Sequence, residues 1–253
     1  MIMSSILNRA AALLVAVCLT VTSRAGAQSP TAMAGPLNNG GIIKLFGANN
    51  SFISKAEIKS IDKSNKELTS MPLVFSMLDG RIRMEVDLND MKSAERPDPA
   101  FLYSRQLGMD KVIAVIRPDK KDDLVIYPKT SAYAEVAMTK EEEDDIKKKY
   151  TIKQTSVGKE TVNGHPCVKH EVTLTGEKGD KQSLLVWNAT DLKDFPVQIH
   201  ILGGDDVIVM SFQDVKLIKP EARLFERPEG LTRYETAEKL VRALVAKSTT
   251  GKN

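Results

Sequence analysis

Residues 73–88 read LVFSMLDGRIRMEVDL, and this stretch decides the fold class. Residues 73–78 form an apolar run, Asp79-Gly80 is a turn dipeptide, and apolar and charged side chains alternate in residues 81–88. In an extended strand, this period of two places four apolar side chains on one face, namely Ile82, Met84, Val86 and Leu88. Because Asp-Gly is typical of two-residue hairpin loops, the stretch predicts two antiparallel strands with one buried face.

The same pattern continues on both sides of this hairpin. Further strands, separated by turn residues, are predicted at residues 52–62, 111–117, 124–127, 132–136, 159–162, 167–174, 182–187, 195–202 and 207–217. Asn163-Gly164 predicts a second tight hairpin turn. About ten short antiparallel strands with few helices indicate a mainly β chain with flanking helices (α+β), built as a barrel, a half-barrel or a sandwich.

Two helices are predicted from capping boxes, in which a Ser or Thr precedes a Glu by three residues. Thr139 and Glu142 begin a charged surface helix, and Thr232 and Glu235 begin a C-terminal helix. The C-terminal helix has an apolar stripe at a spacing of 3.6 residues, formed by Ala237, Leu240, Val241, Leu244 and Val245. This stripe predicts that the C-terminal helix packs against the sheet.

Residues 1–27 have the pattern of a cleaved signal peptide. Arg9 precedes an uncharged apolar stretch at residues 10–21, and Ala25-Gly26-Ala27 is a small-residue cleavage site. The apolar stretch is shorter than the roughly 17 residues that a membrane span needs. We therefore expect cleavage after Ala27 and a periplasmic or secreted protein. The alternatives are an uncleaved N-terminal anchor and a lipoprotein signal acylated on Cys18.

Composition and charge narrow the classes of partner. The chain has 253 residues, 42% of them hydrophobic and 27% charged, which is typical of a globular domain. Removal of residues 1–27 takes away Arg9 and Arg24 and no acid, so the formal net charge falls from +3 to +1. A nearly neutral chain with 5% aromatic residues predicts no nucleic-acid partner. We expect the mature chain to comprise a flexible leader or short helix (28–48), one domain (49–235) and a C-terminal helix and tail (236–253).

The search for catalytic or metal-binding residues centres on His165, Cys167 and His170. On a strand, residues 165 and 167 share a face and residue 170 lies on the other, so one metal ion requires a bulge to reach all three. The sequence also lacks the common hydrolase, phosphate-binding, dinucleotide-binding and zinc-protease motifs. We therefore predict no catalytic residues, no metal, no cofactor and no enzymatic activity. A hydrolase or metal protein that uses residues 165–170 is the rival interpretation.

A family resemblance appears in the order of several short segments. They are residues 52–58, LDGRIRME (78–85), VIRPD (115–119), VIYP (125–128), GKETVNG (158–164), CVKH (167–170), WNATDLKDFPV (187–197) and LFERPEG (224–230). Over about residues 50–235, the chain resembles exported bacterial domains of unknown function that are similar to the outer-membrane lipoprotein carriers (LolA/LolB-like proteins). The resemblance implies an incompletely closed antiparallel barrel whose apolar concave face is covered by helices.

In the carriers, that concave face holds the acyl chains of lipoproteins. The resemblance therefore implies an apolar ligand, a lipid or an acylated protein as partner, and peripheral contact with an envelope membrane. From the alternating pattern we expect the ligand cavity to be lined by Ile82, Met84, Val86, Leu88, Trp187, Val197, Ile199 and Ile201. The alternative is an envelope structural or protein-interaction module whose apolar face is filled by its own helices, with no ligand.

Overall fold

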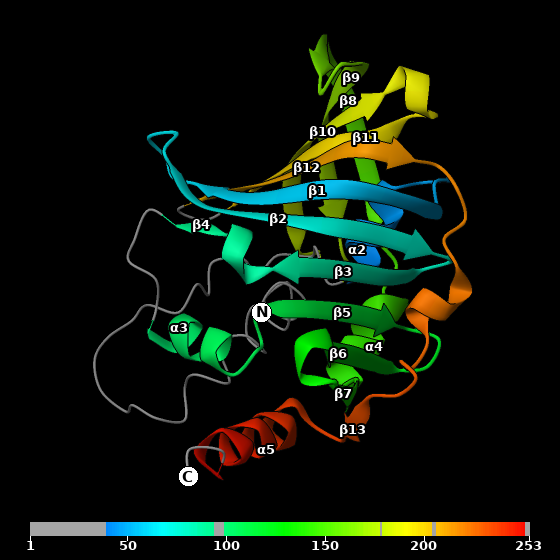
Figure 1. Ribbon diagram of the computed structural model, residues 1–253. Coiled ribbons are helices and arrows are strands. Elements are labelled where there is room, and N and C mark those ends of the chain that lie inside the picture. The colour runs from blue at the N-terminus through cyan, green and yellow to red at the C-terminus, as the bar shows by residue number, and fades with distance from the viewer. Residues whose placement is uncertain (1–38, 94–98, 178, 204–205, 251–253) are drawn as a thin grey trace.

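The computed structural model of the chain describes residues 39–93, 99–177, 179–203 and 206–250. The predicted signal peptide (1–27) and most of the predicted leader lie outside these residues. The described chain forms one open sheet of thirteen strands with four α-helices around it (Figure 1). The mainly β, incompletely closed architecture with a C-terminal helix is thereby confirmed, with more strands than the ten predicted.

The strands are short to medium in length and follow one another closely along the chain. They are β1 (Ser51–Ile61), β2 (Glu67–Leu78), β3 (Arg81–Asp87), β4 (Lys92–Ser93), β5 (Lys111–Arg117), β6 (Asp122–Tyr127), β7 (Ala132–Ala137), β8 (Thr151–Val162), β9 (His165–Thr175), β10 (Lys181–Ala189), β11 (Phe195–Leu202), β12 (Val207–Lys216) and β13 (Thr232–Tyr234). The helices are α2 (Asn39–Leu45), α3 (Pro99–Gln106), α4 (Lys140–Lys147) and α5 (Ala237–Thr250). Four 3-10 turns complete the elements: η2 (Leu88–Asp90), η3 (Pro128–Thr130), η4 (Thr190–Leu192) and η5 (Ala222–Phe225).

Strand β1 lies in the middle of the sheet and divides it into two wings. The order is β13-β7-β6-β5-β3-β2-β1-β12-β11-β10-β9-β8, and β4 pairs with β2 outside this path. We call β2–β7 with β13 the first wing and β8–β12 the second wing. Neighbouring strands are antiparallel except for β13, which pairs with β7 in parallel. Strands β13 and β8 stand at the two ends of this order and do not pair with each other, so the sheet is open.

The predicted hairpin turns have the backbone that their residues favour. Asp79 and Gly80 have φ angles of 50° and 85°, and Asn163 and Gly164 have φ angles of 52° and 84°. Two consecutive positive φ angles define a turn whose twist matches that of the flanking strands. Strands β2 and β3 therefore pair directly across the turn, with Met77 opposite Ile82 and Leu73 opposite Val86.

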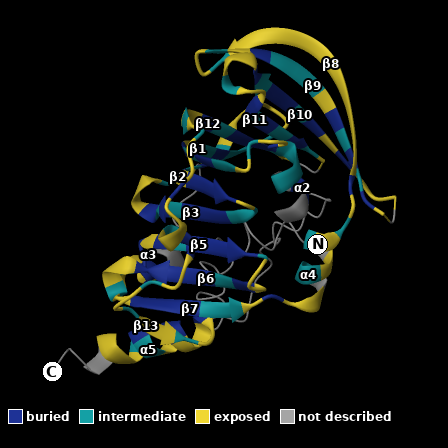
Figure 2. Cartoon of the chain, turned by 90° about the vertical axis from the view of Figure 1, so that its right-hand side faces the viewer, coloured by how far each residue is buried: buried dark blue, intermediate teal, exposed yellow. Residues whose placement is uncertain are grey.

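The two faces of the sheet are covered by different parts of the chain. We call the face that carries Ile82, Met84 and Val86 the inner face, and the opposite one the outer face. The sheet curves so that α2 and α4 lie within its concavity on the inner side (Figure 2). The apolar stripe of α5 joins the same hydrophobic cluster as the inner face, because Ala237, Leu240, Val241 and Leu244 are buried there as predicted.

On the outer face, η5 covers part of the first wing. Phe225 is fully buried there in a second hydrophobic cluster that includes Val115, Leu124 and Tyr133. A buried ion pair lies in the same region, where the Arg117 guanidinium donates to both carboxylate oxygens of Asp122 at 2.7 Å. The middle of the first wing is thus packed on both faces.

One of the two predicted helix starts is correct. Thr139 and Glu142 form the expected capping box at α4, with the Glu142 N–H donating to Thr139 Oγ1 at 3.3 Å. The helix start predicted from Thr232 and Glu235 is wrong, because Thr232–Tyr234 forms strand β13 and pairs with Ala132–Ala134 of β7. Helix α5 begins later, and its first turn is capped by Thr236, whose Oγ1 accepts from the Lys239 N–H at 3.1 Å. Pairing with β7 satisfies the backbone that the predicted helical turn would have used.

Among the described residues, no helix has both the length and the apolar character that crossing a membrane requires.

Candidate functional site

Seven of the eight predicted cavity residues lie on the inner face or at its margin. They are buried, with exposed fractions between 0 and 7%, and they belong to the same hydrophobic cluster: Ile82, Met84, Val86, Leu88, Val197, Ile199 and Ile201. The first four come from β3 and η2 in the first wing, and the other three come from β11 in the second wing. The structure therefore brings together residues from two hairpins that are far apart in the sequence.

Cross-strand rows of apolar side chains connect these two groups. One row runs over four neighbouring strands through Val112, Val86, Leu73 and Ala56. A second row runs from Ile58 on β1 through Met210 on β12 and Ile199 on β11 to Val186 on β10. Directly opposite residues on neighbouring strands have side chains about 5 Å apart, so each row forms a continuous apolar surface.

Five phenylalanines fill one end of the inner face. Phe46, at the end of α2, packs against Phe52, Phe75, Phe195 and Phe212, which come from four different strands. The ring centroids of these pairs are 4.9–6.0 Å apart, within the range of favourable aromatic contacts. This cluster holds α2 against the strands on both sides of β1.

Two polar atoms on the inner face are buried without a hydrogen-bond partner in the described part of the chain. One is the Ser54 Oγ, whose side chain alternates with those of Phe52 and Ala56 and lies opposite Phe75. The other is the Nδ1 atom of His170, which is opposite Val186. A buried hydroxyl that lacks a partner costs about 1–3 kcal/mol relative to a satisfied one. Both atoms can therefore accept or donate a hydrogen bond to a bound molecule without breaking an existing one.

The eighth predicted cavity residue, Trp187, lies on the outer face. Its ring contacts that of His200 at 4.5 Å between centroids, and His200 points away from its neighbours Ile199 and Ile201. The Nζ atom of Lys169 lies 4.7 Å from the Trp187 ring, and Trp187 Nε1 donates to Glu160 Oε1 at 2.6 Å. The structure therefore places Trp187 on the opposite face from the other seven residues, although its ring is buried and belongs to the same hydrophobic cluster.

Burial lowers the pKa of His200 below its usual value, and the positive charge of Lys169 contributes in the same direction. The imidazole is therefore held in its neutral form beside Trp187. His200 is half-buried, with the Trp187 ring packed against it.

The His165–His170 segment does not gather its three candidate ligands. His165 Nδ1 lies 2.8 Å from Asp191 Oδ2, and the Cys167 thiol donates to the carbonyl oxygen of His165 at 3.3 Å. Burial raises the pKa of the Cys167 thiol, which disfavours the thiolate that a metal ion or a nucleophilic reaction would use. In the described ranges, no group of three His, Cys, Asp or Glu residues is arranged to hold a metal ion.

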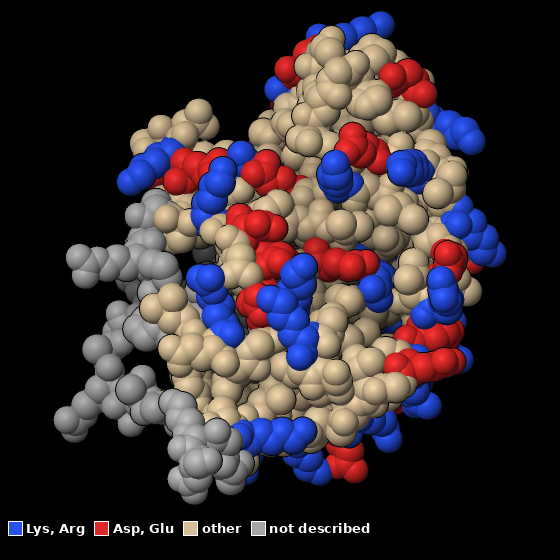
Figure 3. All heavy atoms as spheres, in the orientation of Figure 1, with Lys and Arg blue, Asp and Glu red and all other residues tan. Residues whose placement is uncertain are grey.

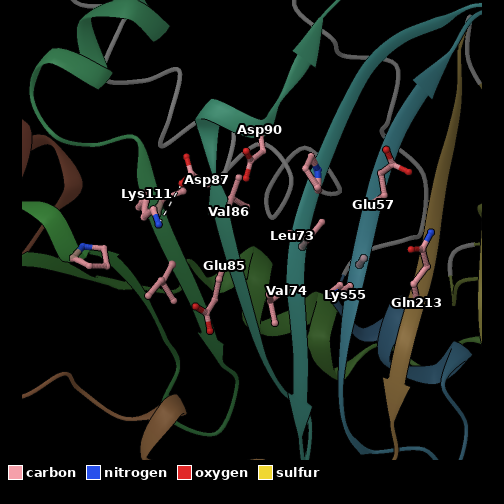
Figure 4. Close-up of a pocket in the computed structure, with 15 residues that line it drawn as sticks. Lys55, Glu57, Leu73, Val74, Glu85, Val86, Asp87, Asp90, Lys111 and Gln213 are labelled. Carbon is pink, nitrogen blue, oxygen red and sulfur yellow. Dashed lines mark ion pairs between the residues drawn. The ribbon is translucent and has the colours of Figure 1, made fainter.

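The outer face carries a hollow that the sequence did not indicate. Its volume is about 570 Å³, and it lies over β1, β2, β3 and β5 (Figure 4). The side chains of Pro72 and Val74 on β2 are short, whereas the flanking strands present longer charged side chains. The residues that line it are Lys55, Glu57, Pro72, Val74, Glu85, Asp87, Asp90, Lys111, Ile113, Pro128 and Gln213, and it also borders Ala56, Leu73, Val86 and Val112, whose side chains alternate to the inner face.

The charges around this hollow are largely paired within the chain. Lys55 pairs with Asp214 at 2.7 Å, and Asp87 lies 3.4 Å from Lys111. Glu85 accepts from Arg83 at 2.9 Å. Acidic and basic side chains are accordingly interspersed over this face (Figure 3). The hollow therefore offers a mixed polar surface, in contrast to the apolar inner face.

Three bacterial proteins are among the solved structures that are similar to this chain. Lipoprotein LppX of Mycobacterium tuberculosis has a TM-score of 0.38 at 12% identity, covering 69% of this chain and 92% of its own. The LolA superfamily protein NE2245 of Nitrosomonas europaea has a TM-score of 0.37 at 14% identity, covering 73% and 93%. LprF of Mycobacterium bovis has a TM-score of 0.38 at 10% identity, covering 72% and 96%. No curated protein matches the chain.

The sequence itself matches one protein family, described as "Domain of unknown function (DUF4412)", over residues 70–206. The matched region includes β2 to β11 and so contains most of both wings. It also confirms the predicted kinship with a domain family of unknown function, and the similar structures include a member of the LolA superfamily that the sequence resembles. Because the match extends over more than half of its length, this chain belongs to the DUF4412 family.

Proposed function

We propose that this protein is an exported, non-enzymatic binding protein that takes up an acyl chain on the inner face of its sheet. The observation that carries the proposal is the continuous apolar surface that joins Met84 and Val86 in the first wing to Ile199 and Ile201 in the second. An acyl chain is long, narrow and apolar, so it matches a surface made of parallel rows of aliphatic side chains. Burying it supplies about 25 cal/mol per Å² of apolar surface before the costs of ordering are subtracted.

The covering elements are small enough to move without unfolding the sheet. Helix α2 has seven residues and α4 has eight, and they contact each other on the inner side. Lys44 of α2 donates to the carbonyl oxygen of Lys148 at 3.4 Å, and its Nζ lies 5.1 Å from the ring of Tyr150. Displacement of this pair breaks these contacts and the ring contacts of Phe46, and it uncovers inner-face side chains while the strands remain paired.

The buried Ser54 hydroxyl refines the class of ligand. It lies in the middle of the inner face and lacks a partner there. An ester, amide or carboxylate oxygen at the head of an acyl chain accepts a hydrogen bond from such a hydroxyl. We therefore favour a ligand in which an acyl chain is attached to a lipid or protein, or ends in a carboxyl group.

Export and contact with a membrane belong to the same proposal. The pattern of residues 1–27 is that of a signal peptide, and cleavage after Ala27 leaves Cys167 as the single cysteine, so the mature domain needs no disulfide. Leu102 and Tyr103 are exposed on α3, which projects from the sheet (Figure 1). Exposed aliphatic and aromatic side chains on one short helix are suited to brief contact with an envelope membrane, where acyl ligands are collected or delivered.

A structural or protein-interaction module is the second candidate. It is favoured by the phenylalanine cluster around Phe46 and by the low exposure of the inner-face residues, because a filled core needs no ligand. The two candidates differ in whether an apolar molecule accompanies the purified protein.

Native mass spectrometry of the mature protein, purified from the periplasm and then extracted with organic solvent, tests the proposal. We expect a fatty-acyl or phospholipid adduct, and uptake of a fluorescent fatty acid by the delipidated protein. The variant Met84→Lys places a charge on the inner face and should abolish both. The matched control Glu85→Lys changes the neighbouring outward-facing residue and should retain both. A bare polypeptide mass together with no fatty-acid uptake would overturn the proposal.

The stability of each variant is measured as well, because a lysine at the buried position 84 also destabilises the core. Urea unfolding of each variant separates loss of binding from loss of folding. Ser54→Ala is the milder companion, since it removes a buried hydroxyl that has no partner and should therefore not lower the free energy of unfolding. Weaker binding of a carboxyl-terminated chain by a fully stable Ser54→Ala protein places the ligand on the inner face. Equal losses of stability and binding in Met84→Lys indicate a packed core instead.

A further inference from the structure

Strand β8 is a long sheet edge that is exposed along nearly its whole length. It has twelve residues, and all of them except Val162 are exposed (Figure 2). It stands last in the strand order, so it pairs on one side with β9 and ends the sheet on the other. The exposed side chains include two large apolar ones, Ile152 at 39% and Val157 at 46%.

The other edge of the sheet is protected in the ways that proteins normally use. Strand β13 has three residues, and α5 follows it and contacts both β13 and β7. Very short edges and edges covered by a helix do not present a row of unpaired backbone groups. The contrast shows that the chain shields one edge and leaves twelve residues of backbone at the other.

A bulge divides β8 into a half that pairs regularly with β9 and a half in which the register is shifted. The register with β9 shifts between Ser156 and Gly158, whereas Thr151–Ser156 pairs regularly with β9. In this regular half, Ile152 and Gln154 lie on the inner face, opposite the buried Leu174 and Val172. Thr151, Lys153 and Thr155 lie on the outer face. A strand added to this half therefore meets an apolar residue on one face and a lysine on the other.

The charge of this edge is positive. Strand β8 contains two lysines, Lys153 and Lys159, and a single acid, Glu160. Glu160 is already engaged, because it accepts from Trp187 Nε1 and lies 3.6 Å from Lys169 Nζ. On the adjacent strand, Lys169 and Glu171 offset each other. The edge thus has a net positive charge that a partner of opposite charge would satisfy.

We propose that β8 binds an extended acidic segment of a partner polypeptide, which adds to the regular half of the strand as a further β-strand. Backbone hydrogen bonds to Thr151–Ser156 supply the affinity, and alternate side chains supply the specificity. The fitting segment has five or six residues in which Asp or Glu, facing Lys153, alternates with aliphatic residues facing Ile152. A second copy of this chain fits less well, because it brings the same excess of lysines to the interface.

Strand addition is testable with a defined peptide. The probe is fluorescein-labelled Thr-Glu-Val-Glu-Val-Glu-Thr, acetylated and amidated at its ends, titrated with the purified protein by fluorescence anisotropy. The same peptide methylated on the backbone nitrogens of both valines keeps its charge but loses amide donors. We expect the methylated peptide and a version with Lys in place of Glu to bind at least tenfold more weakly. We also expect slower amide hydrogen exchange in residues 151–156 when the first peptide is present.

Protein variants show whether β8 is the strand involved. Lys153→Glu should weaken binding of the probe at least tenfold, whereas Lys120→Glu, a matched change of an exposed lysine in the first wing, should have little effect. Fatty-acid uptake should be unchanged in both variants, so failure here is distinguishable from failure of the proposed function. Equal binding of the methylated peptide, no effect of Lys153→Glu, or sedimentation as a dimer that Lys153→Glu dissociates would each overturn the proposal.

Discussion

The two wings of the sheet are held in place by different means, although β1 connects them into one sheet. In the first wing, β5 and β6 are buried on both faces, by the inner hydrophobic cluster and by the outer one around Phe225. In the second wing, burial falls strand by strand from β11 to β9, and β8 is exposed. A strand packed on both faces is stabilised by its side chains, whereas β8 depends on hydrogen bonds to a single neighbour.

This difference assigns distinct roles to the two wings. The first wing has a closing segment, η5, that carries the buried Phe225 ring, and Glu226 directly after it pairs with Arg81 of β3. The second wing leaves its outermost strand exposed, and the buried Trp187 ring packs against the half-buried His200. Regions with few buried contacts are the ones that proteins use for binding and rearrangement, because they open at low free-energy cost.

The largest loss of stability is expected when the outer cover of the first wing is removed. Phe225→Ala should lower the free energy of unfolding by about 3–5 kcal/mol, because it creates a cavity where a fully buried ring lay. Urea unfolding measures the loss. The control Ile218→Ala, in the same segment but 53% exposed, should stay within about 0.5 kcal/mol. Similar losses in both variants would show that the segment contributes no packed cluster.

Acidification should weaken the second wing through His200, by less than the loss of Phe225. Since folding lowers the pKa of this imidazole, its contribution is complete above the ordinary histidine pKa of about 6.5 and is lost as the pH falls below it. Trp187 is the only tryptophan of the chain, so its fluorescence reports this contact.

We expect Trp187 emission to change as the pH falls from 7 towards 5, together with a decrease in the urea midpoint. His200→Gln should remove that part of the pH dependence, whereas His165→Gln should leave it in place. A pH profile that is identical in His200→Gln and the unmodified protein would contradict this assignment.

The smallest effect is expected at the outermost strand. Ile152→Thr should change the free energy of unfolding by no more than about 0.5 kcal/mol, because the side chain is already largely exposed and Thr suits a strand. A thermal unfolding series that also includes Val157→Thr tests a second exposed position of the same strand. A loss above 2 kcal/mol in either variant would mean that β8 is packed in solution, and would count against its use as a free edge.

The candidate site shows where sequence patterns were sufficient. The alternation in residues 81–88 correctly placed Ile82, Met84 and Val86 on one buried face, because neighbouring residues of a strand must point to opposite sides. Residues 197, 199 and 201 follow the same rule. The same rule also explains why Trp187 was wrongly grouped with them: its neighbour Val186 pairs with Ile199 on the inner face, so Trp187 lies on the outer face opposite Gln198, under Lys169.

Sequence patterns did not predict the features that depend on pairing between strands far apart in the chain. Residues 232–234 resemble the start of a helix when they are considered alone, and they become β13 because β7 offers a partner in the folded chain. The hollow on the outer face was also missed, since it depends on which strands flank Pro72 and Val74. Local patterns contain no information on such neighbours.

Local sequence patterns were enough to predict most of the strands, the two hairpin turns and the faces of most strands, because turn dihedrals and side-chain alternation follow from a few consecutive residues. The position of β1 between the two wings, with Ile58 beside both Met71 and Met210, follows only from the folded chain. The tertiary structure also decided that one edge is shielded by α5 while β8 is left exposed. These outcomes depend on the burial of many distant side chains at once, which no short stretch of sequence specifies.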